Sequence, residues 1–266
     1  KLDVQVLTYF KLKSKKPVNL NPWKKITKII LQTKKQINIA IIGKYVELKD
    51  AYKSLDEALT HGGIKNNVKV NLVRIDSEKL KISEIRSKLK DISGILIPGG
   101  FGKRGTEGKI EAIKFARNNK IPFLGICYGM QMAIIEFARN KLNLKNATSS
   151  EFDKKGTHII GLISEWTKGD KIIKGTDKNL GGTMRLGSYE AKLKDNSKIK
   201  NIYKKNLIKE RHRHRYEVNI AYKEKFEKKG MSFSGLSPDG RLPEIIELKN
   251  HPWFIGVQFH PEFKSR

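Results

Sequence analysis

Residues 122–131 of this chain read Pro-Phe-Leu-Gly-Ile-Cys-Tyr-Gly-Met-Gln and join two apolar runs through a Gly-x-Cys-x-Gly turn. The pattern predicts a strand, a sharp turn and a helix that begins directly after Cys127. At such a turn the central residue is strained and side chains two positions to either side would collide, so Gly125 and Gly129 suit the geometry. A cysteine at a helix start is favoured as a thiolate, the form that attacks carbonyl carbons. We therefore interpret Cys127 as a nucleophile rather than as a buried inert thiol.

The composition favours a globular protein with a sizeable core. The chain has 266 residues and a single cysteine, which excludes an internal disulfide framework and a cysteine-rich metal site. No apolar run approaches the ~20 residues that a membrane span needs. The 55 lysines and arginines exceed the 27 aspartates and glutamates, giving a net charge of +28. This charge raises nucleic-acid binding as an alternative, but the lysines are spread along the chain without a nucleic-acid motif, so we interpret them as a solvated surface.

Strand and helix patterns alternate from Gln36 onwards. Apolar or alternating runs predict strands, and helical spacing with capping and stop signals predicts helices between them. The predicted strands are 37–43, 68–75, 94–97 and 122–126, and the predicted helices start near 50, 82 and 106. This order predicts an α/β fold with a mainly parallel, flavodoxin-like central sheet, helices on both faces, and a site at the carboxyl ends of the strands. The second half is expected to add further strands.

Residues 1–35 differ from the rest of the chain because they are basic and lack sustained periodicity. We interpret them as a linker, and we assign residues 36–266 to one domain. Trp23 together with the spacing of Ile26, Ile29 and Ile30 predicts a short helix that packs on the following domain.

A glycine-rich segment at residues 98–105 follows a predicted strand, precedes a helix and contains Gly-x-Gly-x-x-Gly. A dinucleotide site would need an acidic residue at the end of the next strand, where Cys127 stands instead. The glycines are better suited to bring backbone N–H groups close to the cysteine. We expect Gly100 and the N–H of Tyr128 to form an oxyanion hole. The sequence contains no Gly-x-x-x-x-Gly-Lys-Ser/Thr motif for ATP.

A nucleophilic cysteine needs a base and a group that orients the base. His260 ends a strand-like apolar run and is followed by Pro261 and Glu262. Residues two apart in an extended segment face the same side, so Glu262 is predicted to orient the His260 imidazole and stabilise its charge. His212 and His214 alternate with arginines, whose positive charge opposes protonation and a metal pair. We predict no metal site.

The Gly-Ile-Cys-Tyr-Gly-Met-Gln turn and the terminal Gln-Phe-His-Pro-Glu resemble the class I, triad-type glutamine amidotransferases. Over nearly its whole length the chain resembles the glutaminase domain of the CTP synthase family. The most specific stretches are Gly-Gly-Thr-Met-Arg at 181–185 and Arg-His-Arg-His-Arg-Tyr-Glu at 211–217. The resemblance implies the class I amidotransferase fold, with extra strands in the second half. It implies a triad of Cys127, His260 and Glu262.

The resemblance also implies residues that bind glutamine and respond to GTP. The expected glutamine-binding residues are Gly100, Tyr128, Gly129, Met130, Gln131, Glu151 and Arg215. The carboxylate of Glu151 would bind the ammonium of free glutamine, and the guanidinium of Arg215 its carboxylate. In the family GTP activates glutamine hydrolysis through a mobile lid that corresponds to residues 181–187. The residues that we expect to respond to GTP are Lys44, Lys53 and Arg185.

What the resemblance implies beyond this chain is an N-terminal synthetase domain, absent here, that binds ATP, Mg²⁺ and UTP and uses the released ammonia to make CTP. Family members are cytoplasmic homo-oligomers, and the family continues beyond the end of this chain, so we interpret the chain as a fragment. We expect no cofactor in the fragment and no membrane or nucleic-acid partner. Two alternatives stay open: another Cys-His-Glu hydrolase of the same fold, such as a γ-glutamyl hydrolase or peptidase, and a basic nucleic-acid-binding module.

Overall fold

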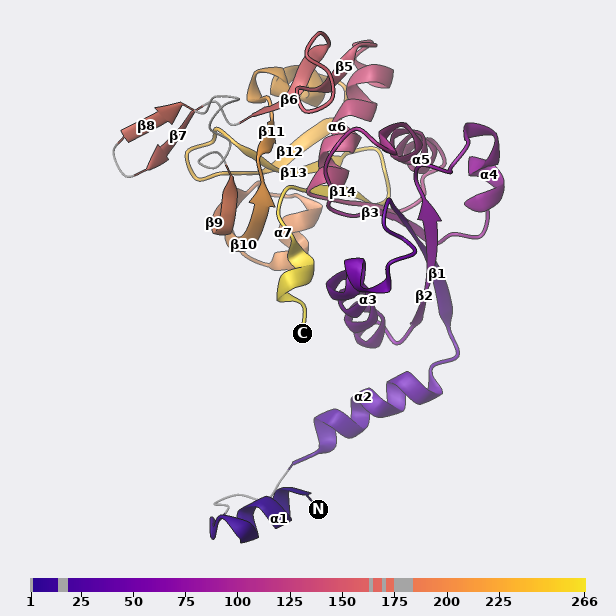
Figure 1. Ribbon diagram of the computed structural model, residues 1–266, viewed down its shortest axis with the longest axis vertical. Coiled ribbons are helices and arrows are strands. Elements are labelled where there is room, and N and C mark those ends of the chain that lie inside the picture. Colours follow the sequence, from indigo (N-terminus) through magenta and orange to yellow (C-terminus); the bar gives the residue numbers. More distant parts are fainter. Residues whose placement is uncertain (1, 14–18, 163–164, 169–170, 175–183) are drawn as a thin grey trace.

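The computed structural model describes residues 2–13, 19–162, 165–168, 171–174 and 184–266. A nine-stranded sheet crosses the domain in the order β10-β9-β12-β13-β14-β4-β3-β1-β2 (Figure 1). In that order its strands are β10 (Leu207–His214), β9 (Arg185–Leu193), β12 (Met231–Leu236), β13 (Pro243–Leu248), β14 (Phe254–Val257), β4 (Phe123–Ile126), β3 (Gly94–Ile97), β1 (Gln36–Gly43) and β2 (Lys69–Asp76).

The sheet has a parallel half and an antiparallel half that meet at β14. Strands β14, β4, β3, β1 and β2 pair in parallel, whereas the pairs from β14 across to β10 are antiparallel. A second sheet has the order β11-β6-β5, and β7 and β8 form a two-stranded antiparallel sheet. These strands are β5 (Ala147–Ser149), β6 (Thr157–Leu162), β7 (Glu165–Lys168), β8 (Lys171–Lys174) and β11 (Tyr216–Val218). The predicted α/β class is therefore confirmed, and the second half supplies the added strands.

Helices connect the parallel strands and cover the sheet. They are α3 (Lys53–Lys65), α4 (Ile85–Lys88), α5 (Thr106–Asn118) and α6 (Tyr128–Lys141), followed in the second half by α7 (Lys198–Tyr203) and α8 (Lys223–Lys228). Short 3₁₀ helices lie at η1 (Lys49–Tyr52), η2 (Ile82–Glu84), η4 (Ile220–Tyr222) and η5 (Pro261–Lys264).

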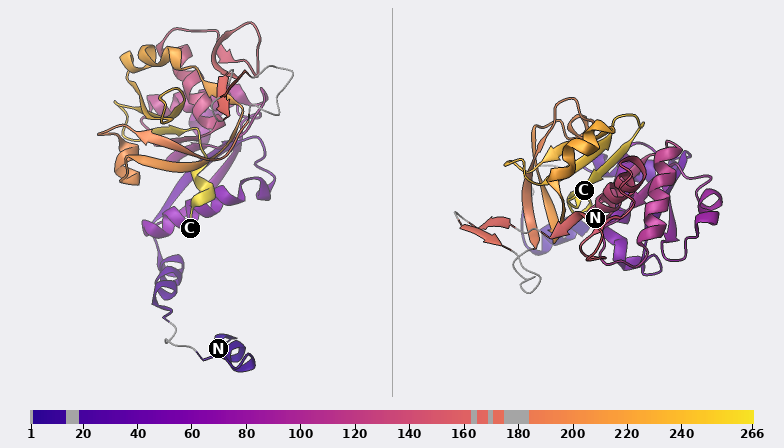
Figure 2. Two further views of the ribbon diagram at one scale, coloured as in Figure 1. Left: turned by 90° about the vertical axis from the view of Figure 1, so that its left-hand side faces the viewer. Right: turned by 90° about the horizontal axis from the view of Figure 1, so that it is seen from above.

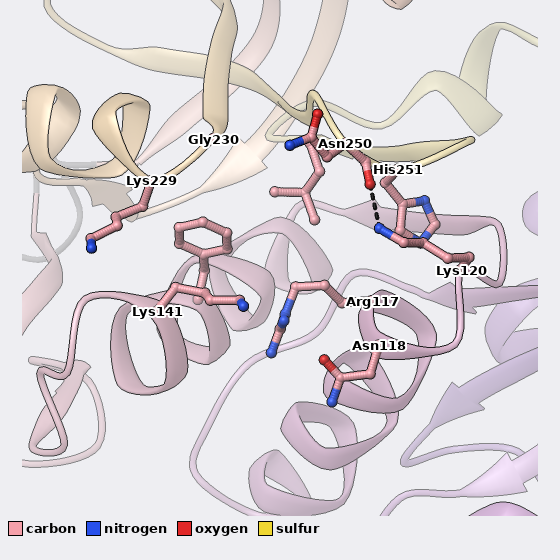
Figure 3. A pocket seen from close by; sticks show the side chains of 10 residues that line it. Arg117, Asn118, Lys120, Lys141, Lys229, Gly230, Asn250 and His251 are labelled. Atoms are coloured by element: carbon pink, nitrogen blue, oxygen red, sulfur yellow. Dashed lines mark hydrogen bonds between the residues drawn. The ribbon is translucent and has the colours of Figure 1, made fainter.

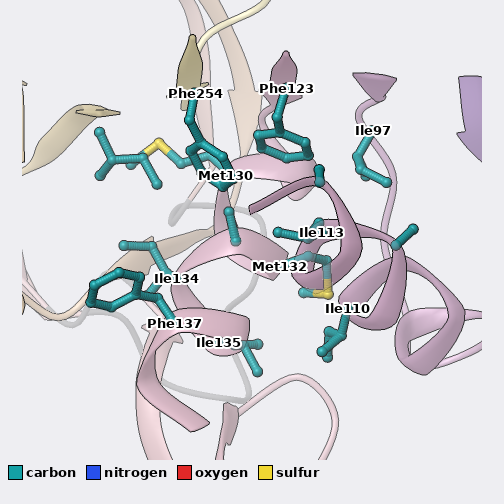
Figure 4. Close-up of a cluster of buried hydrophobic side chains, with 14 of the residues drawn as sticks. Ile97, Ile110, Ile113, Phe123, Met130, Met132, Ile134, Ile135, Phe137 and Phe254 are labelled. Carbon is teal, nitrogen blue, oxygen red and sulfur yellow. The ribbon is translucent and has the colours of Figure 1, made fainter. Parts of the chain in front are cut away.

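The larger core lies between α5, α6 and one face of the sheet (Figure 4). Successive residues of a strand point to opposite faces, so Ile42 and Ile97 face this core while their neighbours Ile41 and Leu96 face the other. Helix α6 is buried almost all round, from Tyr128 to Ala138, because it packs between the large sheet and the second sheet. Full burial of each large apolar side chain contributes about 1.5–3 kcal/mol. This packing fixes the first turn of α6 rigidly.

The N-terminal segment carries α1 (Leu2–Tyr9) and α2 (Asn21–Gln32). Figure 2 shows α2 lying outside the α/β domain. The predicted helix around Trp23 is present, but the expectation that it packs on the domain is wrong. Trp23 is 68% exposed and Ile30 58% exposed, and α2 buries none of its residues. Its apolar side is strongly segregated from its lysines, which explains why the helical spacing is visible in the sequence without any burial against the sheet.

Candidate active site

Cys127 occupies a strained elbow between β4 and α6. Its φ is +52° and its ψ is −101°, a backbone conformation that residues with a side chain rarely adopt. The backbone N–H of Cys127 donates to the carbonyl of Val257 at 2.6 Å, which ties the elbow to the end of β14. The Cys127 side chain is 4% exposed. The turn and the helix start that the sequence predicts are both present.

The glycines on either side of the elbow are required by close packing. A Cβ atom on Gly125 would lie 2.7 Å from the backbone of Gly129. A Cβ atom on Gly129 would lie 2.2 Å from the carbonyl oxygen of Ile97 in β3. The prediction of a steric need for glycine is therefore correct, although at Gly129 the collision is with the neighbouring strand.

His260 and Glu262 lie next to each other where the chain leaves β14. His260 Nδ1 is 2.7 Å from Glu262 Oε1, and the His260 ring stacks on Phe263 with centroids 5.1 Å apart. A Cβ atom on Gly99 would lie 2.7 Å from His260 Cε1, so the glycine loop also contacts this ring. The predicted pairing is present, but the predicted extended geometry is wrong. β14 ends at Val257, and Pro261 starts the 3₁₀ helix η5, whose turn brings the carboxylate back to the imidazole.

His260 also interacts with Cys127. Burial alone would favour the neutral ring, but the hydrogen bonds and charges of Cys127 and Glu262 raise the pKa of His260 to about 10. Because Nδ1 faces Glu262, Nε2 is left for the sulfur. The arrangement therefore favours the charged form of the His260 ring at neutral pH.

Gln258 contacts the same sulfur and was not predicted from the sequence. Its Nε2 is 3.6 Å from Cys127 Sγ. Its Oε1 accepts a hydrogen bond from Nε2 of Gln131 at 3.2 Å, and the same Gln131 nitrogen donates to the carbonyl of Tyr216 at 2.8 Å. Its sequence signals were its place at the head of the Gln-Phe-His-Pro-Glu stretch and its position two residues before His260.

The glycine-rich loop between β3 and α5 lies over the first turn of α6. Gly100 lies close to the Tyr128 ring, since a Cβ atom built on Gly100 would be 3.8 Å from Tyr128 Cδ1. The Tyr128 hydroxyl donates to the carbonyl of Gly102 at 2.5 Å, and the N–H of Gly102 donates to Glu151 at 2.6 Å. Nζ of Lys44 donates to the carbonyl of Phe101. These bonds place Gly100, Tyr128 and Glu151 together at the loop.

Glu151 lies at the glycine-rich loop, whereas Arg215 directly follows β10. Burial raises the pKa of Glu151, whereas the N–H of Gly102 and the charge of Lys44 oppose this shift. Arg215 lies between β10 and β11 and adjoins Tyr216, whose carbonyl is bound to Gln131. Nη1 of Arg215 is buried and has no hydrogen-bond partner among the described residues. A buried guanidinium nitrogen without a partner is suited to an anionic ligand group.

The other predicted glutamine-binding residues contribute mainly backbone. The Met130 side chain is fully buried in the core, and a Cβ at Gly256 would lie 3.1 Å from its Cγ. Gly129 lies in the tight contact with β3. Only the backbone of these two residues is therefore available to a ligand.

The three residues expected to respond to GTP do not form one site in this structure. Lys44 lies at the glycine loop, whereas Lys53 begins α3 and lines a cavity of about 170 Å³ beside His260. Arg185 is buried on β9, with 2.8 Å contacts from its guanidinium to Glu217 and to Glu244. Residues 181–183 of the expected lid lie outside the described residues.

His212 and His214 are buried neighbours of the Arg185 cluster. Burial, followed by the charge of Arg185, lowers the pKa of His212 to about 2 and that of His214 to about 3. The prediction that these rings resist protonation is correct, but its reason is wrong, because Arg211 and Arg213 point outward and are exposed. Across the described part of the chain, no group of three or more acidic, histidine or cysteine side chains could hold a metal ion.

A second, basic cavity of about 260 Å³ lies at the amino ends of β4 and β14 (Figure 3). Its lining includes Lys120, Lys141, Lys229 and His251. Cys127 follows the carboxyl end of β4, so this cavity lies at the opposite edge of the sheet and takes no part in the site. Of the helices that the structure describes, none has the length and apolar character to cross a membrane.

Comparisons with known proteins agree with this geometry. The family model "Glutamine amidotransferase class-I" matches residues 47–266. The chain is 88% identical over 266 residues to the CTP synthase of Pelagibacter ubique and 53% identical to that of Maricaulis maris, in each case covering 100% of this chain and 49% of the relative. The chain thus spans about half the length of these curated relatives.

A solved structure described as "Trypanosoma brucei CTPS - glutaminase domain with bound acivicin" superposes on the chain with a TM-score of 0.75. The two sequences are 37% identical, and the match covers 85% of this chain and 86% of that one. The fold, the turn at Cys127 and the sequence comparisons all indicate the same family. The chain belongs to the class I glutamine amidotransferases and, within them, to the group of CTP synthase glutaminase domains.

Proposed function

We propose that this chain releases ammonia from the side-chain amide of L-glutamine, with Cys127 as nucleophile, His260 as acid and base, and Glu262 as the group that orients His260. The observation that carries this proposal is the contact series at the elbow. Cys127 is held at a strained turn and interacts with His260, whose Nδ1 is 2.7 Å from Glu262 Oε1. A nucleophile, a base and an orienting carboxylate in series form the arrangement for acyl transfer.

The first step is attack of the thiolate on the amide carbon of glutamine. The N–H of Tyr128 is available for the developing oxyanion, because the first N–H groups of a helix have no partner within the helix. Gly100, which lies close to the Tyr128 ring, is the proposed second donor. The proton on His260 then passes to the departing nitrogen, and ammonia leaves a glutamyl thioester on Cys127.

The second step is hydrolysis of the thioester. When the sulfur is acylated it carries no charge, and one of the two partners that raise the pKa of His260 is lost. The ring can then accept a proton from water, which attacks the thioester carbon and gives glutamate. Glu262 stabilises the imidazolium that forms, and the proton returns to the leaving sulfur or to solvent.

Free glutamine would be recognised by its two charged groups. We assign its ammonium to Glu151 and its carboxylate to Arg215, whose Nη1 is buried without a partner in the described structure. The backbone at Gly100 and from Tyr128 to Gln131 would complete the pocket. A site that pairs with both groups favours free glutamine over a glutamine residue inside a peptide, whose α-nitrogen and α-carbonyl are held in amide bonds.

In the whole protein we propose that the ammonia is used by a synthetase domain that binds ATP, Mg²⁺ and UTP and makes CTP, with GTP as activator. The support is the name CTP synthase carried by relatives twice as long as this chain. Residues 1–35 would link the two domains, and Lys44, Lys53 and Arg185 would respond to GTP. We further propose a cytoplasmic homo-oligomer.

The test is mass spectrometry after incubation with diazo-oxo-norleucine, an electrophilic mimic of glutamine. We expect one adduct on Cys127 that excess glutamine blocks and that Cys127→Ser abolishes. Arg215→Met should slow labelling by this mimic while leaving labelling by iodoacetamide unchanged. An adduct formed equally fast in Arg215→Met, or preferential hydrolysis of γ-glutamyl peptides, would contradict the proposed substrate.

A further inference from the structure

Gln258 is a buried amide next to the reacting sulfur and has no place in the proposed triad. Its side chain is completely inaccessible to solvent, and its backbone N–H donates to the carbonyl of Glu244 at 2.8 Å. The side-chain Nε2 is 3.6 Å from Cys127 Sγ. Both polar atoms of this amide have a partner in the core, Gln131 on one side and Cys127 on the other. The direction of its hydrogen bonds can therefore be worked out.

The carbonyl of Tyr216 sets that direction. A carbonyl oxygen can only accept, so the group of Gln131 that faces it at 2.8 Å must be the NH₂. The same NH₂ is 3.2 Å from the Gln258 amide, which must therefore present its oxygen to Gln131 and its NH₂ to the sulfur. Reversing Gln258 would set two NH₂ groups against each other, and reversing Gln131 as well would set its oxygen against the carbonyl of Tyr216.

We propose that Gln258 is a positioning residue that donates a hydrogen bond to Cys127, stabilising the thiolate and fixing the direction of its sulfur. The inference rests on the proposed function, in which Cys127 is the nucleophile. A donor favours the charged sulfur over the thiol, and a donor in a buried site is more effective than water.

The same bond acts in both steps of the proposed reaction. Before attack it lowers the free energy of the thiolate and restricts rotation of the Cys127 side chain. During hydrolysis of the thioester the sulfur regains its charge as the leaving group, and the Gln258 NH₂ faces it again. Gln131 acts one residue further away, since its amide holds Gln258 in the donating orientation.

The test is the pH dependence of Cys127 alkylation by iodoacetamide, which needs no glutamine pocket. Because the chain has one cysteine, the measured rate has one source. We expect Gln258→Met to move the pH midpoint of alkylation upward by about one unit, so that the rate well below the midpoint falls about tenfold. The matched control is Gln36→Met, at the exposed start of β1, which should leave the midpoint unchanged. An unchanged midpoint in Gln258→Met would overturn the inference, even if the variant melts at a lower temperature.

A second measurement uses the unsubstituted chain, in case Gln258→Met folds poorly. The side-chain amide protons of Gln258 should shift in NMR spectra with the same pH midpoint as alkylation, and this titration should vanish in Cys127→Ser. Amide protons that do not titrate would overturn the inference. Labelling by diazo-oxo-norleucine tests the proposed function separately: its absence in the parent chain refutes the substrate, while an unshifted alkylation midpoint refutes only the role of Gln258.

Discussion

Replacement of Arg185 by methionine removes the cation that holds two buried carboxylates together. Nη1 of Arg185 is 2.8 Å from Glu217 and Nη2 is 2.8 Å from Glu244, and these two carboxylates are 5% and 0% exposed. Burial raises the pKa of Glu217 to about 8 although Arg185 lowers it, and burial also raises the pKa of Glu244. His212 and His214 stay neutral, so the charge of the folded cluster comes from one guanidinium and two carboxyl groups. The net charge of the cluster is zero when one of the two carboxyl groups is protonated.

Without Arg185 the folded protein must hold a second proton to avoid a buried charge. Carboxyls in the unfolded chain titrate near their ordinary value of 4.5. Above that pH the folded variant binds one proton more than the folded parent. As the pH rises, the free energy of unfolding of the variant therefore falls more steeply than that of the parent, by about 1.4 kcal/mol per pH unit. Below about pH 4.5 all carboxyls are protonated in both states and the extra loss disappears. Near pH 8 we expect a loss of about 3–5 kcal/mol, the usual cost of leaving a buried charge unpaired.

Urea unfolding followed by tryptophan fluorescence at about pH 5 and about pH 8 measures both losses. Arg241→Met is the matched control, because Arg241 is 68% exposed and lies 3.9 Å from Asp239, so it should cost less than about 1 kcal/mol at either pH. Adding Glu217→Gln to Arg185→Met should recover part of the stability at the higher pH. An equal loss at both pH values would refute the proton count and point to lost packing alone.

Three further outcomes follow from the site. Gly129→Ala should lower stability by at least about 2 kcal/mol in urea unfolding, because a Cβ there would lie 2.2 Å from the carbonyl of Ile97; an unchanged midpoint would contradict the packing. Glu262→Gln should lower the pKa of His260 from about 10 in an NMR titration and slow glutamine hydrolysis about 10²–10⁴-fold; an unshifted ring would contradict the assigned pairing. Arg215→Met should raise KM for glutamine about 10–100-fold with a smaller change in kcat, since the proposed contact between its charge and the bound carboxylate would be made in every step; a loss confined to kcat would contradict this.

The elbow could be predicted from the sequence because its constraint is local. Two glycines at fixed spacing around Cys127, between two apolar runs, leave few other conformations, and the structure has a φ of +52° at the cysteine. The parallel half of the sheet could also be predicted, because the alternation of strands and helices is a local pattern in the sequence. His260 and Glu262 are only two residues apart, so the predicted contact between them is present. It is made by a 3₁₀ turn rather than by the extended segment that the sequence predicted.

Contacts between distant residues could not be predicted in this way. Nothing in the local sequence of Gln258 indicates that its amide meets a sulfur 131 positions earlier. Arg185 stands in a charged, glycine-rich stretch that is typical of a surface loop, yet its side chain is buried by partners on β11 and β13. The arginines around His212 suggested an electrostatic reason for its neutrality, whereas the alternation of β10 turns these arginines to solvent and buries the histidines.

The seam between the two halves of the sheet explains why the site forms here. β4 and β14 pair in parallel with Ile126 opposite Val257, so the residues that follow, Cys127 and Gln258, leave the sheet side by side. The N–H of Cys127 donates to the carbonyl of Val257 across this pair, which extends the parallel register by one bond into the elbow. A slip of one residue would turn every β14 side chain to the other face and remove the amide from the sulfur. The register of one short strand pair therefore places Gln258 beside the nucleophile, while the turn of η5 brings Glu262 to His260.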